Sequence, residues 1–445
     1  MKSLGILWAQ YGPYHFARVA ALKKLAGADR VHALELADRT NDYGWRRSIG
    51  NVELITLRPG GVAESLSFLE VFQQARRAFT ELKIEVCILP SYAPRQSLAA
   101  LMAAKSLGLP TVMMNESHAG TAGARGLSVS VKRRLVGLFD AALVGGQPQK
   151  RHFVSLGMPA EKIFNGYDAV DNDHFVARAD EVRSRRSEYR NQYDLPEHYF
   201  LSLGRLVAKK NLRTLIRAYR KFLDSNRNCR THLVIVGSGE ENDGLRALCR
   251  ELRLPVYDKT PATANPKSRS GGEQSGVHFY GFRQIDENAV FYALADAFIL
   301  PSLWEEWGLV VNEAMACGLP VVVSETAGCA EDLLRPGWPA LPDWVAGKVH
   351  RQLAQLAGRI RQNGFLFDPN SVESLTGALL ALESVPALRE IMGQTSRLIV
   401  ADFSCENFAR NAVWAAGVAM GKGSVSPRDV SPTKQPVSSP SELTR

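Results

Sequence analysis

The sequence lacks any apolar run long enough to cross a membrane. No uncharged apolar stretch in the 445 residues reaches the roughly 18 residues that a spanning helix needs. The first ten residues do not resemble a signal peptide, because their apolar run is short and no small-residue cleavage site follows it. We therefore expect a cytoplasmic protein, and peripheral contact at the inner face of the membrane stays an open alternative.

Metal-binding patterns are also missing. The six cysteines are scattered and none forms a Cys-x-x-Cys pair, which argues against a zinc site and favours free thiols in a reducing compartment. The Asp-Asn-Asp stretch at 171–173 lies at a predicted domain junction and not at the end of a strand. We expect no bound metal and no cofactor.

Signatures of nucleic-acid binding are absent although the chain is basic. The formal net charge is +9 at pH 7, yet the sequence has no zinc-finger spacing, no aromatic RNA-recognition motif and no heptads after a basic region. The positive charge is either an ordinary solvated surface or a means of attracting anionic lipids or anionic substrates. We expect no nucleic-acid partner.

What the sequence has in abundance is an alternation of short apolar runs with helical patterns. This rhythm is typical of parallel sheets that are covered by helices. The length suits two domains of about 150–200 residues, so we predict an α/β fold of two Rossmann-like domains. The predicted strands cover residues 4–9, 31–36, 86–89, 111–114 and 141–144 in the first half, and 199–203, 233–236, 277–280, 297–300 and 321–324 in the second.

The predicted boundaries follow changes in composition. The second domain carries two insertions, and the later one is either a surface helix or a basic amphipathic helix that touches a membrane or an acceptor. The Ser- and Pro-rich tail is expected to be disordered. We predict a first domain at 1–175, a linker at 176–198, a second domain at 199–400 with insertions at about 258–276 and 335–362, a final helix at 401–422 and the tail at 423–445.

The segment 300–320 concentrates the chemistry. A predicted strand ends near residue 300 and a helix begins around Leu309, so Gly308 lies at the carboxyl edge of a sheet, where ligands of open α/β sheets bind. Gly308 lets a ligand approach the backbone, and the first amides of the helix are unpaired donors for a phosphate. Glu305 and Glu313 are separated by seven residues, and each carboxylate suits neighbouring hydroxyls on a sugar or ribose.

A basic motif opens the second half. The strand 199–203 is followed by a turn at Gly204 and then by a helix with Asn211 near its N-cap. This arrangement brings Arg205 and Lys210 onto one patch. A guanidinium and an ammonium there would stabilise the charge that develops on a diphosphate leaving group.

The first half offers less specific candidates. Gly12 lies between a strand and a helix and could bring backbone amides toward phosphates across a cleft, while Tyr14, His15 and Arg18 could reach an acceptor. A tight turn with exposed polar groups is an equally good interpretation.

These segments resemble glycosyltransferase family 4, a large retaining family on the GT-B fold. Pro-Ser-x-x-Glu-x-aromatic-Gly followed by Glu-Ala-Met-Ala-x-Gly-x-Pro matches the E-x7-E motif of that family, with Trp307 in the aromatic position and Glu306 where glycine is usual. The resemblance implies two domains facing across a cleft, with the final helix returning to the first domain. It also implies that Glu305 contacts the donor sugar and that Glu313 holds the ribose.

The resemblance extends to other positions. It makes Arg205, Lys210 and Glu305 catalytic, with a histidine that touches the donor sugar. His118 is our choice for that histidine, and Glu116 is the other candidate because the register is uncertain by about two residues. The donor-binding set that it implies is Gly12, Gly204, Gly237, Gly239, Gly281, Phe282, Trp307, Gly308, Leu309, Val310 and Glu313.

The function implied is retaining, metal-independent transfer of a hexose-type sugar from a UDP- or GDP-sugar to a saccharide or lipid-linked acceptor, in polysaccharide or glycolipid biosynthesis. A GT-B sugar-nucleotide epimerase and a non-catalytic nucleotide-sugar-binding protein are the alternatives. An NAD-dependent oxidoreductase is weaker, because Gly237 and Gly239 are not followed by a third glycine at the required spacing.

Overall fold

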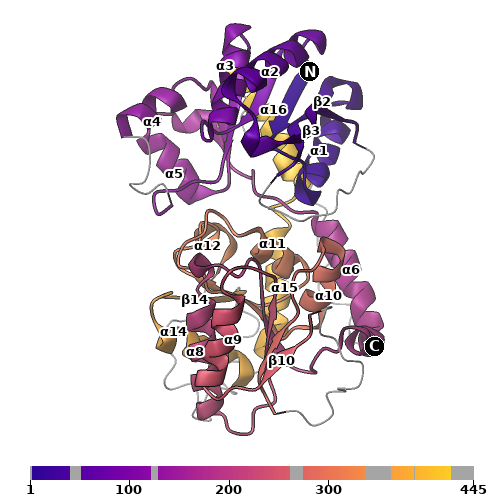
Figure 1. The fold of residues 1–445 in the computed structure, drawn as a ribbon, viewed down its shortest axis with the longest axis vertical. Helices are drawn as coiled ribbons and strands as arrows, with labels where there is room; N and C mark the ends of the chain where they lie inside the picture. Colours follow the sequence, from indigo (N-terminus) through magenta and orange to yellow (C-terminus); the bar gives the residue numbers. More distant parts are fainter. Residues whose placement is uncertain are drawn as a thin grey trace, which may run out of the picture.

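The computed structural model of the chain describes residues 3–40, 52–121, 129–260, 274–335, 362–384 and 386–421. Two lobes stand one above the other in Figure 1, and each is built around its own parallel sheet. The predicted α/β fold of two Rossmann-like domains is therefore confirmed. Most of the segment 258–276, nearly all of the segment 335–362 and the whole of the tail 423–445 lie outside the described residues.

The first sheet has seven parallel strands in the order β3-β2-β1-β4-β5-β6-β7. Helices cover both of its faces, so β1, β5 and β6 are buried at every position and read as continuous apolar runs. The strands are β1 (Leu4–Trp8), β2 (Val31–Arg39), β3 (Leu54–Val62), β4 (Val86–Pro90), β5 (Thr111–Asn115), β6 (Ala141–Val144) and β7 (Ile163–Phe164), and the helices are α1 (Pro13–Ala26), α2 (Phe68–Glu81), α3 (Arg95–Ser106), α4 (Val129–Val136) and α5 (Gln147–Ser155).

The edge strand β3 is missing from the strands predicted above. Its segment Leu54–Val62 contains Pro-Gly-Gly near its end, which is typical of a turn. An edge position tolerates this, because a proline there withholds a hydrogen bond that no further strand would accept. The strand is also only partly buried, which leaves its apolar signal weak.

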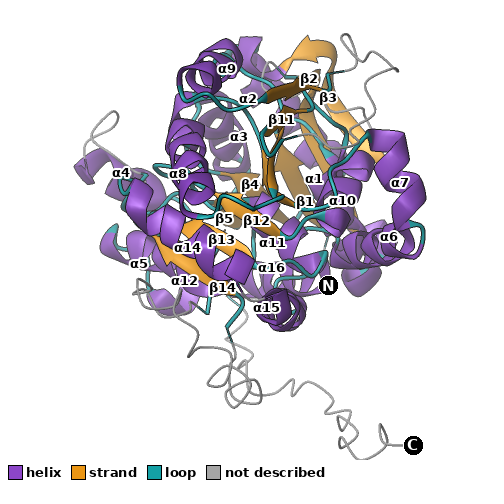
Figure 2. Cartoon of the chain, turned by 90° about the horizontal axis from the view of Figure 1, so that it is seen from below, coloured by secondary structure: helices purple, strands orange, loops and turns teal. Residues whose placement is uncertain are grey.

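The second sheet has the order β10-β11-β9-β8-β12-β13-β14 and is again parallel throughout. In Figure 2, α8 and α9 lie on one side of β11 and β12, and α10 lies on the other. The elements are β8 (Tyr199–Leu203), α8 (Leu212–Ser225), β9 (His232–Val236), α9 (Asn242–Glu251), β10 (Val256–Asp258), β11 (Val277–Phe279), α10 (Ile285–Leu294), β12 (Ala297–Leu300), α11 (Leu309–Ala316), β13 (Val321–Ser324), α12 (Ala330–Leu333), β14 (Gly364–Phe367), α14 (Val372–Ser384) and α15 (Pro386–Val400).

The Arg-rich linker is helical. It folds into α6 (Asn172–Ser184) and α7 (Arg186–Tyr193), with ion pairs three residues apart such as Arg185–Glu188. The buried face of α6 packs against α10 and α11, so the linker is part of the second domain's surface and not a free spacer.

The last described helix, α16 (Cys405–Ala419), crosses back to the first domain, where it packs against α1 and the first sheet. It is the yellow helix in the upper lobe of Figure 1. The Ser404 hydroxyl caps its start, and alanines on its buried face allow close approach. The predicted return of the chain is confirmed. Among the described residues, every helix is too short or too polar to span a membrane.

Candidate active site between the domains

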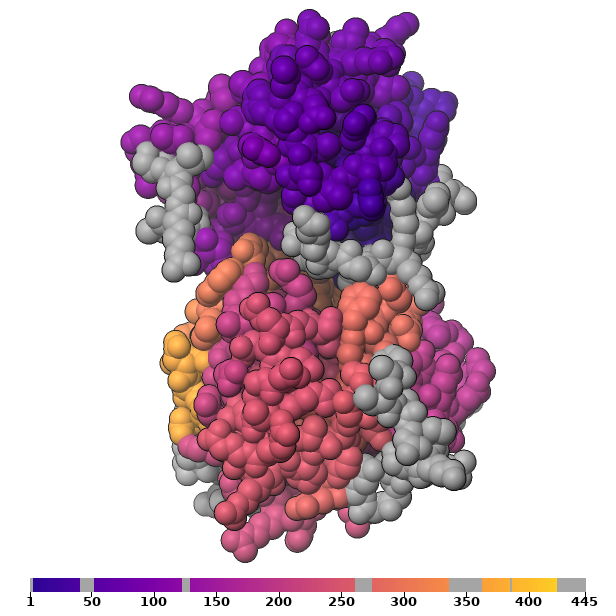
Figure 3. All heavy atoms as spheres, viewed as in Figure 1, coloured from indigo at the N-terminus to yellow at the C-terminus, as the bar shows by residue number. Residues whose placement is uncertain are grey.

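A cavity of about 910 Å³ lies between the two domains. Its walls come from the loops that follow β1, β4 and β5 in the first sheet and β8, β9 and β12 in the second. Both sheets therefore turn their carboxyl ends toward it, which is where open α/β sheets bind ligands. Figure 3 shows the narrowing between the lobes at this level.

The structure brings most of the predicted site residues to this cavity. Four of them do not line it: Gly239, Gly281, Glu313 and His118. Those that do are Gly12, Tyr14, His15, Arg18, Glu116, Gly204, Arg205, Lys210, Gly237, Phe282, Glu305, Trp307, Gly308, Leu309 and Val310.

The basic motif meets the first acidic residue directly. The Lys210 ammonium contacts Oε2 of Glu305, which also accepts a hydrogen bond of 3.1 Å from the Ser302 hydroxyl. Lys209 lies 3.2 Å from Glu306 and stacks 4.3 Å above the Trp304 ring. Each acidic side chain of this loop thus has its own lysine partner, so the loop carries little uncompensated charge into the cavity.

Glycine is required where two loops stack backbone on backbone. Gly237 has a φ of +137°, and a Cβ there would lie 1.9 Å from the carbonyl oxygen of Gly204. Gly308, with a φ of +108°, is the N-cap of α11. It leaves the first amides of that helix facing the cavity beside Leu309, as the sequence indicated.

Glu313 lies on α11, just behind the cavity wall, and is completely buried. The hydroxyl of Tyr292 on α10 donates to its Oε2 at 2.7 Å, and the hydroxyl of Tyr14 donates to its Oε1 from the other domain. Burial raises the pKa of Glu313 to about 7, against the lowering effect of the two tyrosines. Sequence reasoning missed Tyr292, because it stands in the apolar second half of α10 and looks like a core aromatic.

His15 has a structural role beside the turn at Gly12. Its Nδ1 accepts a hydrogen bond of 2.9 Å from the Gly12 amide, and its ring stacks 4.7 Å from that of Trp8. Burial and the neighbouring Arg18 lower the pKa of His15 to about 3, so the ring is neutral. The Gly12 amide therefore donates its hydrogen bond to the imidazole and not to the cavity.

His118 is turned to the opposite domain. Its Nε2 lies 2.9 Å from the carbonyl oxygen of Glu305, and the side chain is buried. Glu116, two residues earlier, lines the cavity instead. The structure thus places these two candidates differently: His118 bonds to the Glu305 loop and Glu116 lines the cavity.

Further contacts join the domains. The Gln149 amide donates to the carbonyl oxygen of Glu306 at 2.7 Å, and the backbone amide of Gln147 donates to Asp332 at 2.9 Å. Arg151 forms a bidentate pair with Glu331. These bonds join the two domains beside the cavity.

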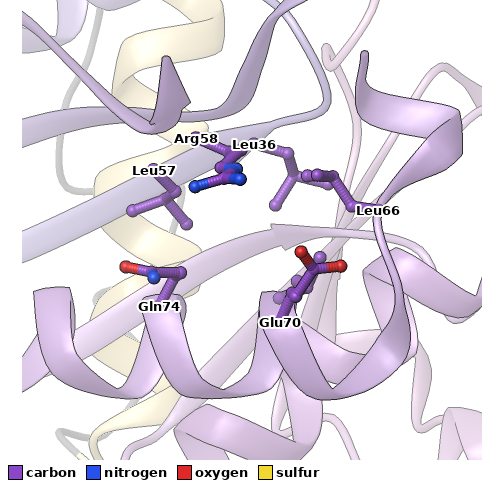
Figure 4. A pocket seen from close by; sticks show the side chains of 7 residues that line it. Leu36, Leu57, Arg58, Leu66, Glu70 and Gln74 are labelled. Carbon is purple, nitrogen blue, oxygen red and sulfur yellow. The ribbon is translucent and has the colours of Figure 1, made fainter. Parts of the chain in front are cut away.

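A second cavity lies in the first domain, between α2 and the strands β2 and β3 (Figure 4). Its volume of about 30 Å³ is near that of one water molecule, and Leu36, Leu57 and Leu66 line it. It is too small for a substrate. Over the described part of the chain, the structure gathers no group of three or more His, Cys, Asp or Glu side chains that could hold a metal.

The second domain resembles a known protein family. Residues 197–385 match the family described as "Glycosyl transferases group 1". "Uncharacterized glycosyltransferase MJ1607" of Methanocaldococcus jannaschii is 33% identical over 197 residues, which are 43% of this chain and 44% of that protein. "Sulfoquinovosyl transferase SQD2" of Arabidopsis thaliana is 27% identical over 308 residues, or 67% of this chain and 50% of that protein. The chain thus spans about half the length of these relatives.

Solved structures resemble the chain over both domains. Anabaena Alr3699/HepE, crystallised in complex with UDP, superposes with a TM-score of 0.59 at 18% identity and covers 93% of this chain and 98% of its own. At this identity the likeness shows the fold. The predicted GT-B arrangement, two Rossmann-like domains facing across a cleft, is confirmed.

Proposed function

We propose that the protein is a retaining glycosyltransferase that moves a hexose-type sugar from a nucleotide-sugar donor to an acceptor, without a metal ion. The observation that carries the proposal is the pairing of Lys210 with Glu305 near the N-terminus of α11. Gly308 and Arg205 line the same interdomain cavity. A diphosphate would bind to Lys210 and the helix amides, and a sugar hydroxyl would donate a hydrogen bond to Glu305. A UDP-sugar donor is supported by the UDP complex of the Anabaena structure.

The proposed reaction needs no other group to balance. The bond between the sugar C1 and the phosphate oxygen breaks, and the acceptor oxygen bonds to C1 on the same face. The proton of the acceptor hydroxyl passes to the leaving phosphate oxygen. Arg205 and Lys210 stabilise the negative charge that develops on the diphosphate, in the role that a metal ion has in other transferases.

The closed arrangement supports transfer over hydrolysis. Contacts such as Gln149 to Glu306 and Gln147 to Asp332 close the domains around the cavity and exclude bulk water from the bound sugar. The volume of about 910 Å³ is at the upper end for ligand pockets, so it has room for an acceptor beside the donor. A saccharide or lipid-linked acceptor is therefore part of the proposal.

Two substitutions test the site. Lys210→Ala removes the cation next to Glu305 and should lower kcat about 10²–10³-fold, as loss of one charge-stabilising donor does. Glu313→Ala should mainly weaken nucleotide binding. Lys221→Ala, an exposed lysine on α8, is the matched control and should transfer sugar like the wild type. Wild-type rates for both site variants would refute the assignment.

The donor and the metal requirement are tested on the wild-type protein. A thermal-shift screen of UDP-, GDP- and ADP-sugars identifies the donor, because a bound ligand raises the melting temperature. Transfer should survive exhaustive chelation. Activity that is lost with a chelator and restored by manganese would contradict the metal-free mechanism.

Peripheral membrane contact is the last part of the proposal. The helix α4 exposes Val129 and Val131 next to Arg133 and Arg134, a combination that suits an anionic lipid surface. The protein should therefore pellet with phosphatidylglycerol vesicles on sedimentation, and it should stay in the supernatant with phosphatidylcholine vesicles. Equal binding to both, or to neither, would contradict it.

A further inference from the structure

Tyr14 is a first-domain residue whose side chain reaches into the second domain. It stands at the start of α1, lines the cavity, and packs against the buried apolar cluster that includes Val311 and Tyr292. Its hydroxyl donates a hydrogen bond to Oε1 of Glu313 across the domain boundary. The side chain that the sequence suggested for an acceptor therefore ends on the carboxylate of α11.

Both oxygens of the Glu313 carboxylate accept a hydrogen bond from a tyrosine. Tyr14 donates to Oε1, and Tyr292 donates to Oε2 at 2.7 Å. Glu313 is 0% exposed and does not line the cavity. Because no surface of the carboxylate reaches the cavity, a ribose can bind to it only where one of the two tyrosine hydroxyls moves aside.

The Tyr14 hydroxyl lies on the cavity side of the carboxylate. Leu309 and Val310 precede Glu313 by about one turn of α11, and both line the cavity. Residues three and four positions apart share a face of a helix, so Glu313 lies on the face of α11 that meets the cavity. Tyr14 lines the cavity as well, whereas Tyr292 on α10 is completely buried. Tyr14 is therefore the hydroxyl that a ligand in the cavity meets first.

Of the two hydrogen bonds, the one from Tyr14 joins the domains. Tyr292 and Glu313 belong to α10 and α11 of the second domain, so an opening of the cleft leaves their bond intact. Tyr14 belongs to α1 of the first domain, and its bond breaks when the domains part. An opening that admits a donor thus also releases Oε1 of Glu313.

A ribose hydroxyl can replace the tyrosine hydroxyl without a change of charge. Each is a neutral O–H donor, and a carboxylate oxygen accepts a hydrogen bond from either. The exchange keeps the buried carboxylate bonded and avoids the free-energy cost of leaving it without a donor. It involves no proton transfer and no covalent bond.

We infer that Tyr14 belongs to the nucleotide site, where its hydroxyl holds the place of a ribose hydroxyl until the donor binds. The ribose then donates to Oε1 of Glu313 in place of Tyr14, while Tyr292 keeps its bond to Oε2. The inference rests on the proposed function, because it takes Glu313 to hold the ribose. Tyr14 is a positioning residue, since it acts through Glu313.

The exchange lowers the affinity for a nucleotide that has ribose hydroxyls. Such a ligand must break the bond between Tyr14 and Glu313 before it can form its own. A nucleotide without ribose hydroxyls leaves Tyr14 in place, so its binding does not depend on that bond. The two kinds of ligand should therefore respond differently when the Tyr14 hydroxyl is removed.

Calorimetric titration of UDP and 2′,3′-dideoxy-UDP tests the exchange, with GDP and its dideoxy analogue in parallel. Tyr14→Phe should bind UDP or GDP about 10-fold more tightly than the wild type, because no hydrogen bond to a carboxylate has to break. Binding of the dideoxy nucleotide should change by less than about threefold. Tyr257→Phe is the matched control, since it removes a hydroxyl that donates to the Gln274 carbonyl outside the cavity, and it should bind all ligands like the wild type.

Two results would overturn the inference. If Tyr14→Phe tightens both kinds of nucleotide equally, loss of the hydroxyl only opens the cleft and no exchange takes place. If it leaves UDP and GDP unchanged or weakens them, Tyr14 does not compete with the ribose. Tyr14→Phe keeps the ring that packs against the second domain, and melting curves identify a variant that fails to fold.

Fluorine NMR gives a second readout that needs no substitution of the ring. With 3-fluorotyrosine incorporated at position 14, saturating UDP should shift the resonance, and 2′,3′-dideoxy-UDP should leave it nearly unchanged. A wild type that binds UDP without this shift overturns the inference alone and leaves the proposed function supported. If neither the wild type nor Tyr14→Phe binds any of the nucleotides, the proposed function fails and the inference fails with it.

Discussion

The environment of Glu313 makes a quantitative prediction about stability and pH. Burial raises its pKa from 4.5 to about 7 in the folded protein. The folded state therefore holds this proton more tightly than the unfolded chain. Stability from this group is complete below pH 4.5 and is lost as the pH rises through 7. The difference in pKa corresponds to about 3 kcal/mol, of which about 2.5 kcal/mol falls between pH 5 and pH 8.

Glu313→Gln removes the titration and nearly preserves the shape. It also loses part of the hydrogen bonding with Tyr14 and Tyr292, an effect that shifts stability at every pH. The pH-dependent part remains: relative to wild type, the variant's free energy of unfolding should rise by about 2.5 kcal/mol from pH 5 to pH 8. Urea unfolding of both proteins, followed by tryptophan fluorescence, measures it. A difference between them that is constant from pH 5 to pH 8 would refute the assigned pKa.

Three further predictions concern the cavity and the contacts between the two domains. Gly237→Ala forces a Cβ to within 1.9 Å of the Gly204 carbonyl and should destabilise the protein by about 2–4 kcal/mol, whereas Gly377→Ala, a helical position with open space, should be neutral or slightly stabilising in melting experiments. Tyr14→Phe removes a hydrogen bond between the domains, so small-angle scattering should show a more open protein, and an unchanged profile would count against this contact. Nucleotide binding at pH 7 should release up to about half a proton if ribose hydroxyls donate to Glu313, and calorimetry in buffers of different ionisation enthalpy detects it.

Local signals explain what the sequence predicted well. Gly308 and Gly318 bracket α11, and both have positive φ, so the boundaries of that helix follow from the two glycines alone. The neighbouring buried strands are short apolar runs, because helices cover both faces of a parallel sheet and its strands are apolar on both sides. These local signals place the motif residues at the carboxyl edge of a sheet.

Long-range contacts explain what it did not predict. Arg18 on α1 and Asp168 after β7 lie far apart in the sequence, and nothing in their local sequence shows that the fold brings them to within 3.9 Å of each other. Tyr292 donates to Glu313 from the apolar second half of α10, where its hydroxyl has no sequence signal. Such contacts depend on register and sheet order, and these are settled by packing over the whole domain.

The loop of Glu305 depends on both domains. His118 and Gln149 from the first domain bond the carbonyl oxygens of Glu305 and Glu306, while Lys210 from the second domain holds the Glu305 carboxylate. Opening the cleft breaks the first two bonds, while Lys210, the Ser302 hydroxyl and the Gly328 amide, all in the second domain, still hold Glu305. The second domain therefore keeps the loop in place when the cleft is open, and the bonds from His118 and Gln149 are added only when the domains close around a donor.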